Sequence, residues 1–113
     1  MFRVSTNRVH DRVRVTEGTR TLDLFVDIDP YTFVPELKAA QDRLAAVEAA
    51  TDDSTPQVLQ AATGFAAAIF GRQQAGKLLA FYGNHAAPAI SICTRYLTRR
   101  LVNKIKRAQR AAR

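Results

Sequence analysis

Apolar and polar residues alternate along most of the first 30 positions. The apolar members of this alternation are Val13, Val15, Leu22, Leu24 and Val26. Its charged members are Arg12, Arg14, Asp23 and Asp27. A period of two is typical of strands with one buried face, and the intervening Glu17-Gly18 favours a turn. Residues 1–30 are therefore predicted to form a β-hairpin with one apolar and one charged face, ending at Asp29-Pro30.

The spacing of apolar residues lengthens to three and four after this hairpin. One stripe at helical spacing consists of Leu37, Ala40, Leu44 and Val47. Pro35 suits the first position of such a helix, where no backbone N–H is needed, so we expect the helix to begin there. A polar break follows at 51–55. Thr55-Pro56 then favours the capped start of a second helix, which is expected to stop at Gly71.

Two more helices are predicted beyond Gly71. The first extends from about Arg72 to Tyr82, and the second begins near Ala87-Pro88. The apolar positions of the last helix fall at spacings of three or four, at Ile90, Cys93, Leu97, Leu101 and Ile105. The whole pattern predicts a single α+β domain with a small antiparallel hairpin over 1–30. A body of about four helices is expected over 35–106, followed by a basic tail at 107–113.

The charge of the chain divides at Asp53. The first 53 residues carry ten Asp/Glu and seven Lys/Arg, a net −3. The other 60 residues carry ten Lys/Arg and no acid, so −3 and +10 give the overall +7. The basic half is therefore expected to meet nucleic acid, another protein or the acidic half of the chain. If two copies meet through their opposite halves, self-association should weaken as the salt concentration rises.

Residues 71–77 match part of a nucleotide-binding motif. They fit the first seven positions of a P-loop, G-x-x-x-x-G-K, but the eighth position is Leu78 instead of the Ser or Thr that binds magnesium. The preceding residues have a helical pattern, and no Asp follows Asp53 to complete the metal site. We therefore reject a nucleotide site. Gly71 is interpreted as a helix stop and Gly76 as a small-residue packing contact.

No set of residue types at catalytic or metal-binding spacing stands out. His10 and His85 are the only histidines, and His85 fits a turn or a helix cap. The neighbouring carboxylate pairs lie beside predicted turns, where Asp bonds to backbone N–H groups. Cys93, the single cysteine, is expected to be a small buried residue. We predict no enzyme activity, cofactor, metal or membrane span, and hence a soluble intracellular protein.

The basic C-terminal helix is the strongest remaining signal. Its cationic residues are Arg95, Arg99, Arg100, Lys104, Lys106, Arg107, Arg110 and Arg113. They could neutralise nucleic-acid phosphates, although no helix-turn-helix spacing, zinc site or RNA-binding aromatic motif accompanies them. They could also contact an acidic protein surface, such as the predicted helix 35–50 of a neighbouring copy, or form a solvated face without a partner. The candidate partner-binding residues among them are Arg95, Arg99, Arg100, Lys104 and Arg107.

Large apolar residues are densest in the middle of the predicted helical body. They are Phe65, Ile69, Phe70, Leu78, Leu79, Phe81 and Tyr82. Such stripes usually form the core of a domain, so we expect most of them to be buried. One or two are expected to contact a partner through apolar anchors at helical spacing, and all except Leu79 are candidates.

The order of the elements is more distinctive than any single motif. A strand pair ends in an acidic, Pro-containing turn (Val26-Asp27-Ile28-Asp29-Pro30), and an amphipathic helix follows at 36–50. A Phe/Ile-rich helix ends in Phe70-Gly71, a short segment ends in Phe81-Tyr82-Gly83-Asn84, and the last helix ends in the basic run from Lys104 to Arg110. Over nearly the whole chain this order resembles the small tail assembly chaperones of long-tailed bacteriophages and their prophage relatives.

The resemblance implies an α+β fold and a non-enzymatic role in phage tail assembly, in the host cytoplasm. Such chaperones bind the tape measure protein, a long and partly apolar helical chain, and keep it soluble until tail tube subunits polymerise around it. The implied partners are the tape measure protein, the tail tube protein and further copies of the chain. The basic C-terminus departs from members whose last helices carry more acid. It supports the other hypothesis, a small basic nucleic-acid-binding protein of phage or mobile-element origin.

Overall fold

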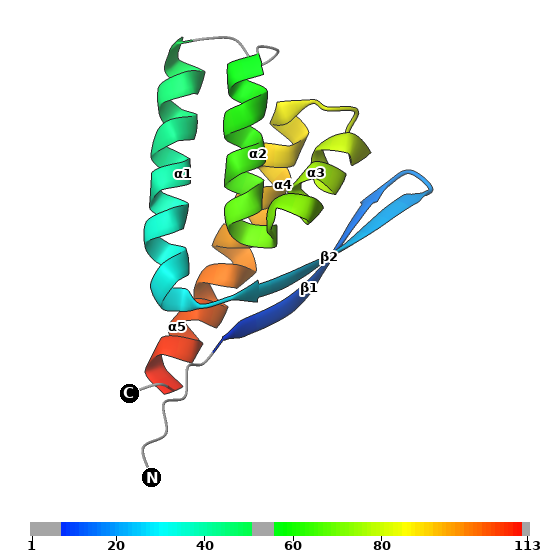
Figure 1. Cartoon of the computed structure of the whole chain (residues 1–113). Helices are drawn as coiled ribbons and strands as arrows, with labels where there is room; N and C mark the ends of the chain where they lie inside the picture. Colours follow the sequence, from blue (N-terminus) through cyan, green and yellow to red (C-terminus); the bar gives the residue numbers. More distant parts are fainter. Residues whose placement is uncertain (1–7, 51–55, 112–113) are drawn as a thin grey trace.

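A two-stranded hairpin precedes a body of helices. The computed structural model describes residues 8–50 and 56–111. The strands are β1 (Val9–Glu17) and β2 (Arg20–Ile28), and the helices that follow are α1 (Pro30–Ala50), α2 (Pro56–Phe70), α3 (Arg72–Phe81) and α4 (Ala86–Tyr96) (Figure 1). A π-helical segment, η1 (Leu97–Leu101), continues α4 directly into α5 (Val102–Ala111). The predicted α+β class, an N-terminal hairpin before a body of about four helices, is confirmed.

The hairpin has the faces that the alternation predicts. Its strands pair from Val9 opposite Ile28 to Glu17 opposite Arg20, which leaves a two-residue loop. Gly18, the first residue of that loop, has φ of 61°, as the first position of a II′ hairpin turn requires. The apolar face is buried against the helices, and the other face is exposed.

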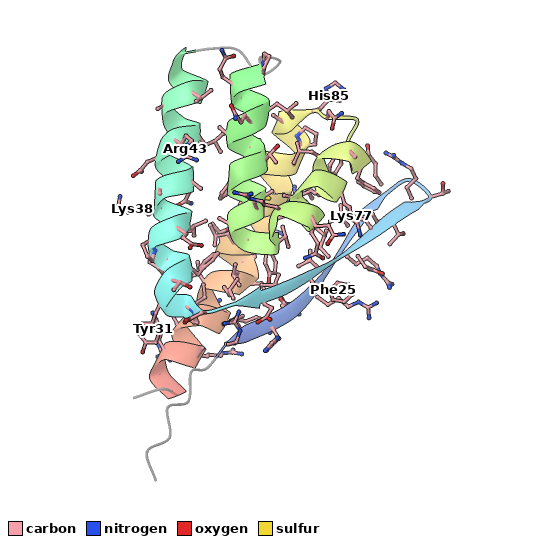
Figure 2. All side chains as sticks on the ribbon, in the orientation of Figure 1. Phe25, Tyr31, Lys38, Arg43, Lys77 and His85 are labelled. Carbon is pink, nitrogen blue, oxygen red and sulfur yellow. The ribbon has the colours of Figure 1, made fainter. Side chains whose placement is uncertain are left out.

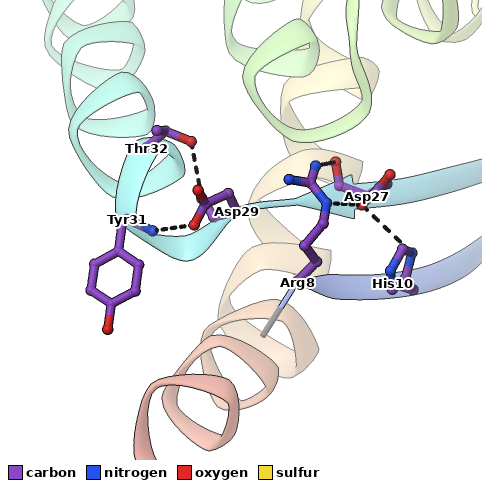
Figure 3. Close-up of polar contacts among 6 residues, drawn as sticks. All are labelled: Arg8, His10, Asp27, Asp29, Tyr31 and Thr32. Atoms are coloured by element: carbon purple, nitrogen blue, oxygen red, sulfur yellow. Dashed lines mark hydrogen bonds and ion pairs between the residues drawn. The ribbon is translucent and has the colours of Figure 1, made fainter. Parts of the chain in front are cut away.

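Ion pairs bridge the two strands on the exposed face. Arg14 Nε lies 2.9 Å from Asp23 Oδ1, and Arg8 Nε lies 2.7 Å from Asp27 Oδ1. His10 lies 3.6 Å from the same Asp27 carboxylate (Figure 3). The hydrogen bonds from the two arginines lower the pKa of both aspartates. Most of the acidic charge of the hairpin is therefore offset within the hairpin itself.

The first helix begins at Pro30, five residues before the predicted start at Pro35. Asp29 caps it: its Oδ1 accepts a hydrogen bond from the backbone N–H of Tyr31 at 3.1 Å (Figure 3). Pro30 then occupies the first helical position, which tolerates a residue without an N–H. Pro35 lies inside the helix, so its predicted role as first residue is wrong. The Asp-Pro pair at the end of β2 is the actual start signal.

The other helix boundaries agree closely with the sequence. Gly71, with φ of 85°, separates α2 from α3, and Gly83 and Asn84, with φ of 65° and 61°, separate α3 from α4. Pro56 is the first residue of α2, while the predicted cap at Thr55 lies outside the described residues. The last helix reaches Ala111, so residues 107–111 of the predicted tail are helical.

One wide turn interrupts the α-helical geometry of the C-terminal helix. In η1 the N–H of Val102 donates to the carbonyl of Leu97, five residues earlier. Cys93, Leu97, Leu101 and Ile105 are spaced by four, and in a straight α-helix each such step goes about 40° beyond a full turn. A π turn holds more residues and absorbs part of this drift. All four side chains are consequently buried on one side of the helix.

The core lies between the apolar face of the hairpin, α2, α3 and the C-terminal helix, while α1 packs along α2 (Figure 1). Its largest fully buried side chains are Leu24, Val26, Ile69, Leu78, Cys93 and Leu101. Burial of Cys93 is as expected and raises the pKa of its thiol to about 12, so the thiol is neutral at physiological pH. No helix within 8–50 or 56–111 has the length and apolarity needed to cross a bilayer.

Candidate functional site

The segment that matches part of a P-loop lies at a junction between two helices. Gly71 ends α2 and caps α3, and residues 72–77 form the first turns of α3. A P-loop follows a buried strand, so this segment lacks the required context. A Cβ at Gly76 would meet no neighbouring atom within 4 Å, so the predicted packing contact at Gly76 is wrong. Within the described ranges, no three His, Cys, Asp or Glu residues gather closely enough to hold a metal.

Four of the six apolar candidates belong to the core. Phe65, Ile69, Phe70 and Leu78 are buried, so a partner contact through these side chains is corrected to a packing role. Phe81 and Tyr82 are partly exposed at the end of α3. Their rings meet edge to face at a centroid distance of 5.1 Å, and the Arg20 guanidinium lies 4.7 Å from the centre of the Phe81 ring. The hairpin tip therefore covers part of this aromatic pair.

The five basic candidates lie in two places. Lys104 and Arg107 line a cavity of about 230 Å³ beside Arg8 and His10, at the open end of the hairpin. Arg95, Arg99 and Arg100 line a larger cavity, which we call the basic groove. Its other lining residues are Val13, Arg14, Val15 and Thr16 of β1, with Ile92 and Tyr96 of α4.

The basic groove, about 390 Å³ in volume, runs between β1 and the C-terminal helix. Its lining is apolar in part, with Val13, Val15, Ile92 and Tyr96. The other lining side chains include the four arginines Arg14, Arg95, Arg99 and Arg100. Arg95 and Arg99 are exposed and make no ion pair with any residue in 8–50 or 56–111. The groove therefore combines apolar surface with uncompensated positive charge.

Asp11 ties the hairpin to this helix. Its carboxylate accepts hydrogen bonds from Tyr96 Oη and Arg100 Nη2, each at 2.8 Å. The backbone N–H of Arg12 is a third donor at 2.8 Å, and the Asp11 side chain is only 5% exposed. Burial, with the hydrogen bond to Asp11, raises the pKa of the Tyr96 phenol above its ordinary value. The role of Asp11 was not predicted from the sequence, although an acid at an inward position of an alternating strand is a local signal for it.

A second elongated hollow, the α1–α2 groove, follows the seam between the first two helices. It consists of adjoining cavities of about 330, 420 and 430 Å³, which are joined by the shared residues Arg43, Glu36, Ala67 and Ala68. Part of it is lined by short side chains, and the rest by longer polar ones such as Arg43, Gln60 and Arg72. The short residues are Ala39, Ala40, Ala61, Gly64, Ala67 and Ala68. A Cβ at Gly64 would have no neighbouring heavy atom within 4 Å, so there is open space above this residue.

The end of this groove lies against the outer edge of β2. Gln74 of α3 binds both backbone groups of Phe25: Oε1 accepts its N–H at 2.6 Å, and Nε2 donates to its carbonyl at 2.6 Å. The Phe25 side chain projects from the exposed face of the hairpin and is 56% exposed (Figure 2). Neither groove was predicted, because each joins segments that are distant in the sequence.

Comparisons of the chain with protein-family models, with curated proteins and with solved structures found no significant match. A function for this chain is therefore inferred from the order of its elements and from the two grooves.

Proposed function

We propose that the protein is a bacteriophage tail assembly chaperone. It binds helical segments of the tape measure protein in the α1–α2 groove and keeps that chain soluble in the host cytoplasm until tail tube subunits polymerise around it. Several copies act along one tape measure chain. The order of hairpin and helices supports the family, and the α1–α2 groove is the observation that carries the contact.

The lining of the groove suits a bound helix. Helix axes can approach closely only where the side chains between them are short, as alanine and glycine are here. The groove accompanies α2 from Gln57 to Gly71, about 20 Å at 1.5 Å per residue, which is enough for roughly four turns of a partner. Arg43 and Glu36 can face polar residues of that helix, while the exposed ring of Phe25 offers an apolar anchor at one end.

Filling the groove tests the proposal. Gly64→Gln places a long side chain in the open space of the groove and removes a glycine from a helix, which favours the fold by up to about 1 kcal/mol. We expect the variant to be at least as stable as the wild type. Co-expressed with a tape measure protein, it should leave most of that protein in the insoluble fraction, whereas the wild-type chain should keep it soluble.

Gly76→Gln is the matched control. Gly76 is also a helical glycine with open space, but it lies on α3 and does not line the groove. This variant should keep the tape measure protein soluble. Equal solubility with Gly64→Gln and Gly76→Gln would sink the groove assignment, and an insoluble tape measure protein with the wild-type chain would sink the proposed function.

Nucleic-acid binding is the second candidate function. It is favoured by the exposed basic residues of the C-terminal helix, of which Arg99, Lys106 and Arg110 have no ion pair with the described part of the chain. Phosphate binding by these residues would give an affinity for duplex DNA that falls steeply with salt. A chain that binds DNA in this way and leaves tape measure protein insoluble would favour this function.

A further inference from the structure

The two edges of the hairpin differ in how they are covered. The register and the bonds from Gln74 show that the backbone groups of Phe25 point away from β1. In an antiparallel pair, every second residue of a strand directs its backbone groups away from the partner strand. The register therefore places the N–H and C=O groups of Arg14 and Thr16 on the outer edge of β1, away from β2. No described residue bonds to these groups of Arg14 and Thr16. β1 therefore keeps a short edge open to another strand.

This open edge forms one wall of the basic groove. Val13 to Thr16 are the only strand residues that line the groove, and the helix opposite contributes Arg95 and Arg99. An unpaired strand edge is a ready template for an incoming strand. Side chains of that strand would alternate between the two faces of the sheet, so those on the inner face would point toward the helix.

From this arrangement we infer that β1 accepts an acidic, extended segment of a partner protein as a third strand. Its main chain pairs with Arg14 and Thr16, and its carboxylates on the inner face lie beside Arg95 and Arg99. Charge complementarity favours an acidic segment, because Arg95 and Arg99 have no ion pair with the described residues. The nearby carboxylate of Asp11 does not neutralise them, since it already accepts bonds from Tyr96 and Arg100. This strand site is separate from the α1–α2 groove and does not depend on the tape measure protein.

A direct test uses the full-length chain and a short labelled peptide in which Glu alternates with Val. The peptide should bind the wild type, and the same peptide with Lys in place of Glu should not. The double variant Arg95→Glu with Arg99→Glu should weaken binding by about a hundredfold, since two favourable charge pairs become repulsive. The control Lys106→Glu with Arg110→Glu changes the charge of the same helix equally, outside the groove, and should retain most of the affinity.

Substitutions that alter the backbone distinguish strand pairing from simple charge attraction. Thr16→Pro removes an outward N–H of β1 and should weaken the peptide about tenfold, whereas Thr21→Pro alters the equivalent site on β2 and should not. In the unmodified protein, peptide binding should also slow hydrogen exchange at the amides of Arg14 and Thr16. Unchanged exchange at both amides would overturn the inference even if the peptide binds. Equal binding of the Lys peptide, or no binding of the Glu peptide, would also overturn the inference. If a single-stranded oligonucleotide displaces the peptide and protects neither amide, the arginines bind phosphate and the inference is overturned as well.

Discussion

At the scale of single residues, Asp11 is where the acidic and basic halves of the chain meet. Its nearly buried carboxylate receives hydrogen bonds from Tyr96 and Arg100, which lie 85 and 89 residues further along the chain. Hydrogen bonds to a charged group are stronger than those between neutral groups. The contact therefore holds β1 on the C-terminal helix just where η1 begins.

Replacing Tyr96 with Phe tests this contact. The variant keeps the ring that stacks on Phe70 at 5.9 Å and loses only the hydroxyl, so we expect the free energy of unfolding to fall by about 1–3 kcal/mol at neutral pH. Because folding raises the pKa of Tyr96, the wild type should be fully stabilised below the ordinary tyrosine pKa of about 10 and lose stability above it. That alkaline loss should be smaller in Tyr96→Phe.

Urea unfolding at neutral and alkaline pH measures both effects. Tyr82→Phe is the control, because the Tyr82 hydroxyl makes no hydrogen bond with the described residues, and it should change stability little at neutral pH. Equal losses in the two variants would mean that Asp11 contributes nothing specific through Tyr96.

At the scale of elements, Gln74 closes the β2 edge that would otherwise be free. It also donates to the carbonyl of Phe70 at 2.7 Å, and so links β2 to the end of α2. Gln74→Ala should lower the free energy of unfolding by about 1 kcal/mol and speed hydrogen exchange at the Phe25 amide. Gln74→Glu should lower the free energy of unfolding further than Gln74→Ala does, since a carboxylate cannot donate hydrogen bonds to the two carbonyls. The exposed neighbour Gln73 serves as the control, because Gln73→Ala should leave the Phe25 amide protected. Unchanged exchange at that amide in Gln74→Ala would show that Gln74 does not close the β2 edge.

Local patterns were enough to predict most elements of the fold. The alternation in β1 and β2, and glycines such as Gly71 and Gly83, act through nearby backbone geometry that a sequence shows directly. The start of α1 was misplaced because two prolines compete for the first helical position, and the capping bond of Asp29 decides between them. The repeated spacing of four in the last helix is a local signal for the π turn, although no π turn was predicted there.

The candidate site was less predictable than the elements, because it depends on which elements meet. Spacing within one helix favoured a buried face for Phe65 and Leu78, but it could not show that Arg95 and Arg99 face a strand edge. The α1–α2 groove likewise arises where alanines of two helices lie opposite one another. Its only local signal was the short residues at helical spacing, Gly64, Ala67 and Ala68, which composition alone explains equally well as helix formers.

At the scale of the whole molecule, the charge divide of the sequence is only partly a divide in space. The hairpin offsets most of its own acids, and on α1 the carboxylate of Asp42 lies 3.6 Å from Lys38 Nζ. The surface of α1 is therefore mixed in charge, which weakens the case that it attracts the basic helix of a second copy. Loss of self-association at high salt stays a prediction. Cations without an ion pair to the described residues extend along the C-terminal helix, from Arg95 and Arg99 beside the basic groove to Lys106 and Arg110 outside it.

The two grooves should consequently respond to salt in opposite ways. Binding of an acidic strand beside Arg95 and Arg99 should weaken as ionic strength rises, because partly exposed charges are screened. Burial of an apolar helix in the α1–α2 groove should persist or strengthen. We expect Gly64→Gln to leave the tape measure protein insoluble but to keep its affinity for the acidic peptide. Arg95→Glu with Arg99→Glu should lose affinity for the peptide but keep the tape measure protein soluble. Measuring both activities of each variant across one salt series checks this independence, and a parallel loss of both activities in either variant would show that the grooves act as a single surface.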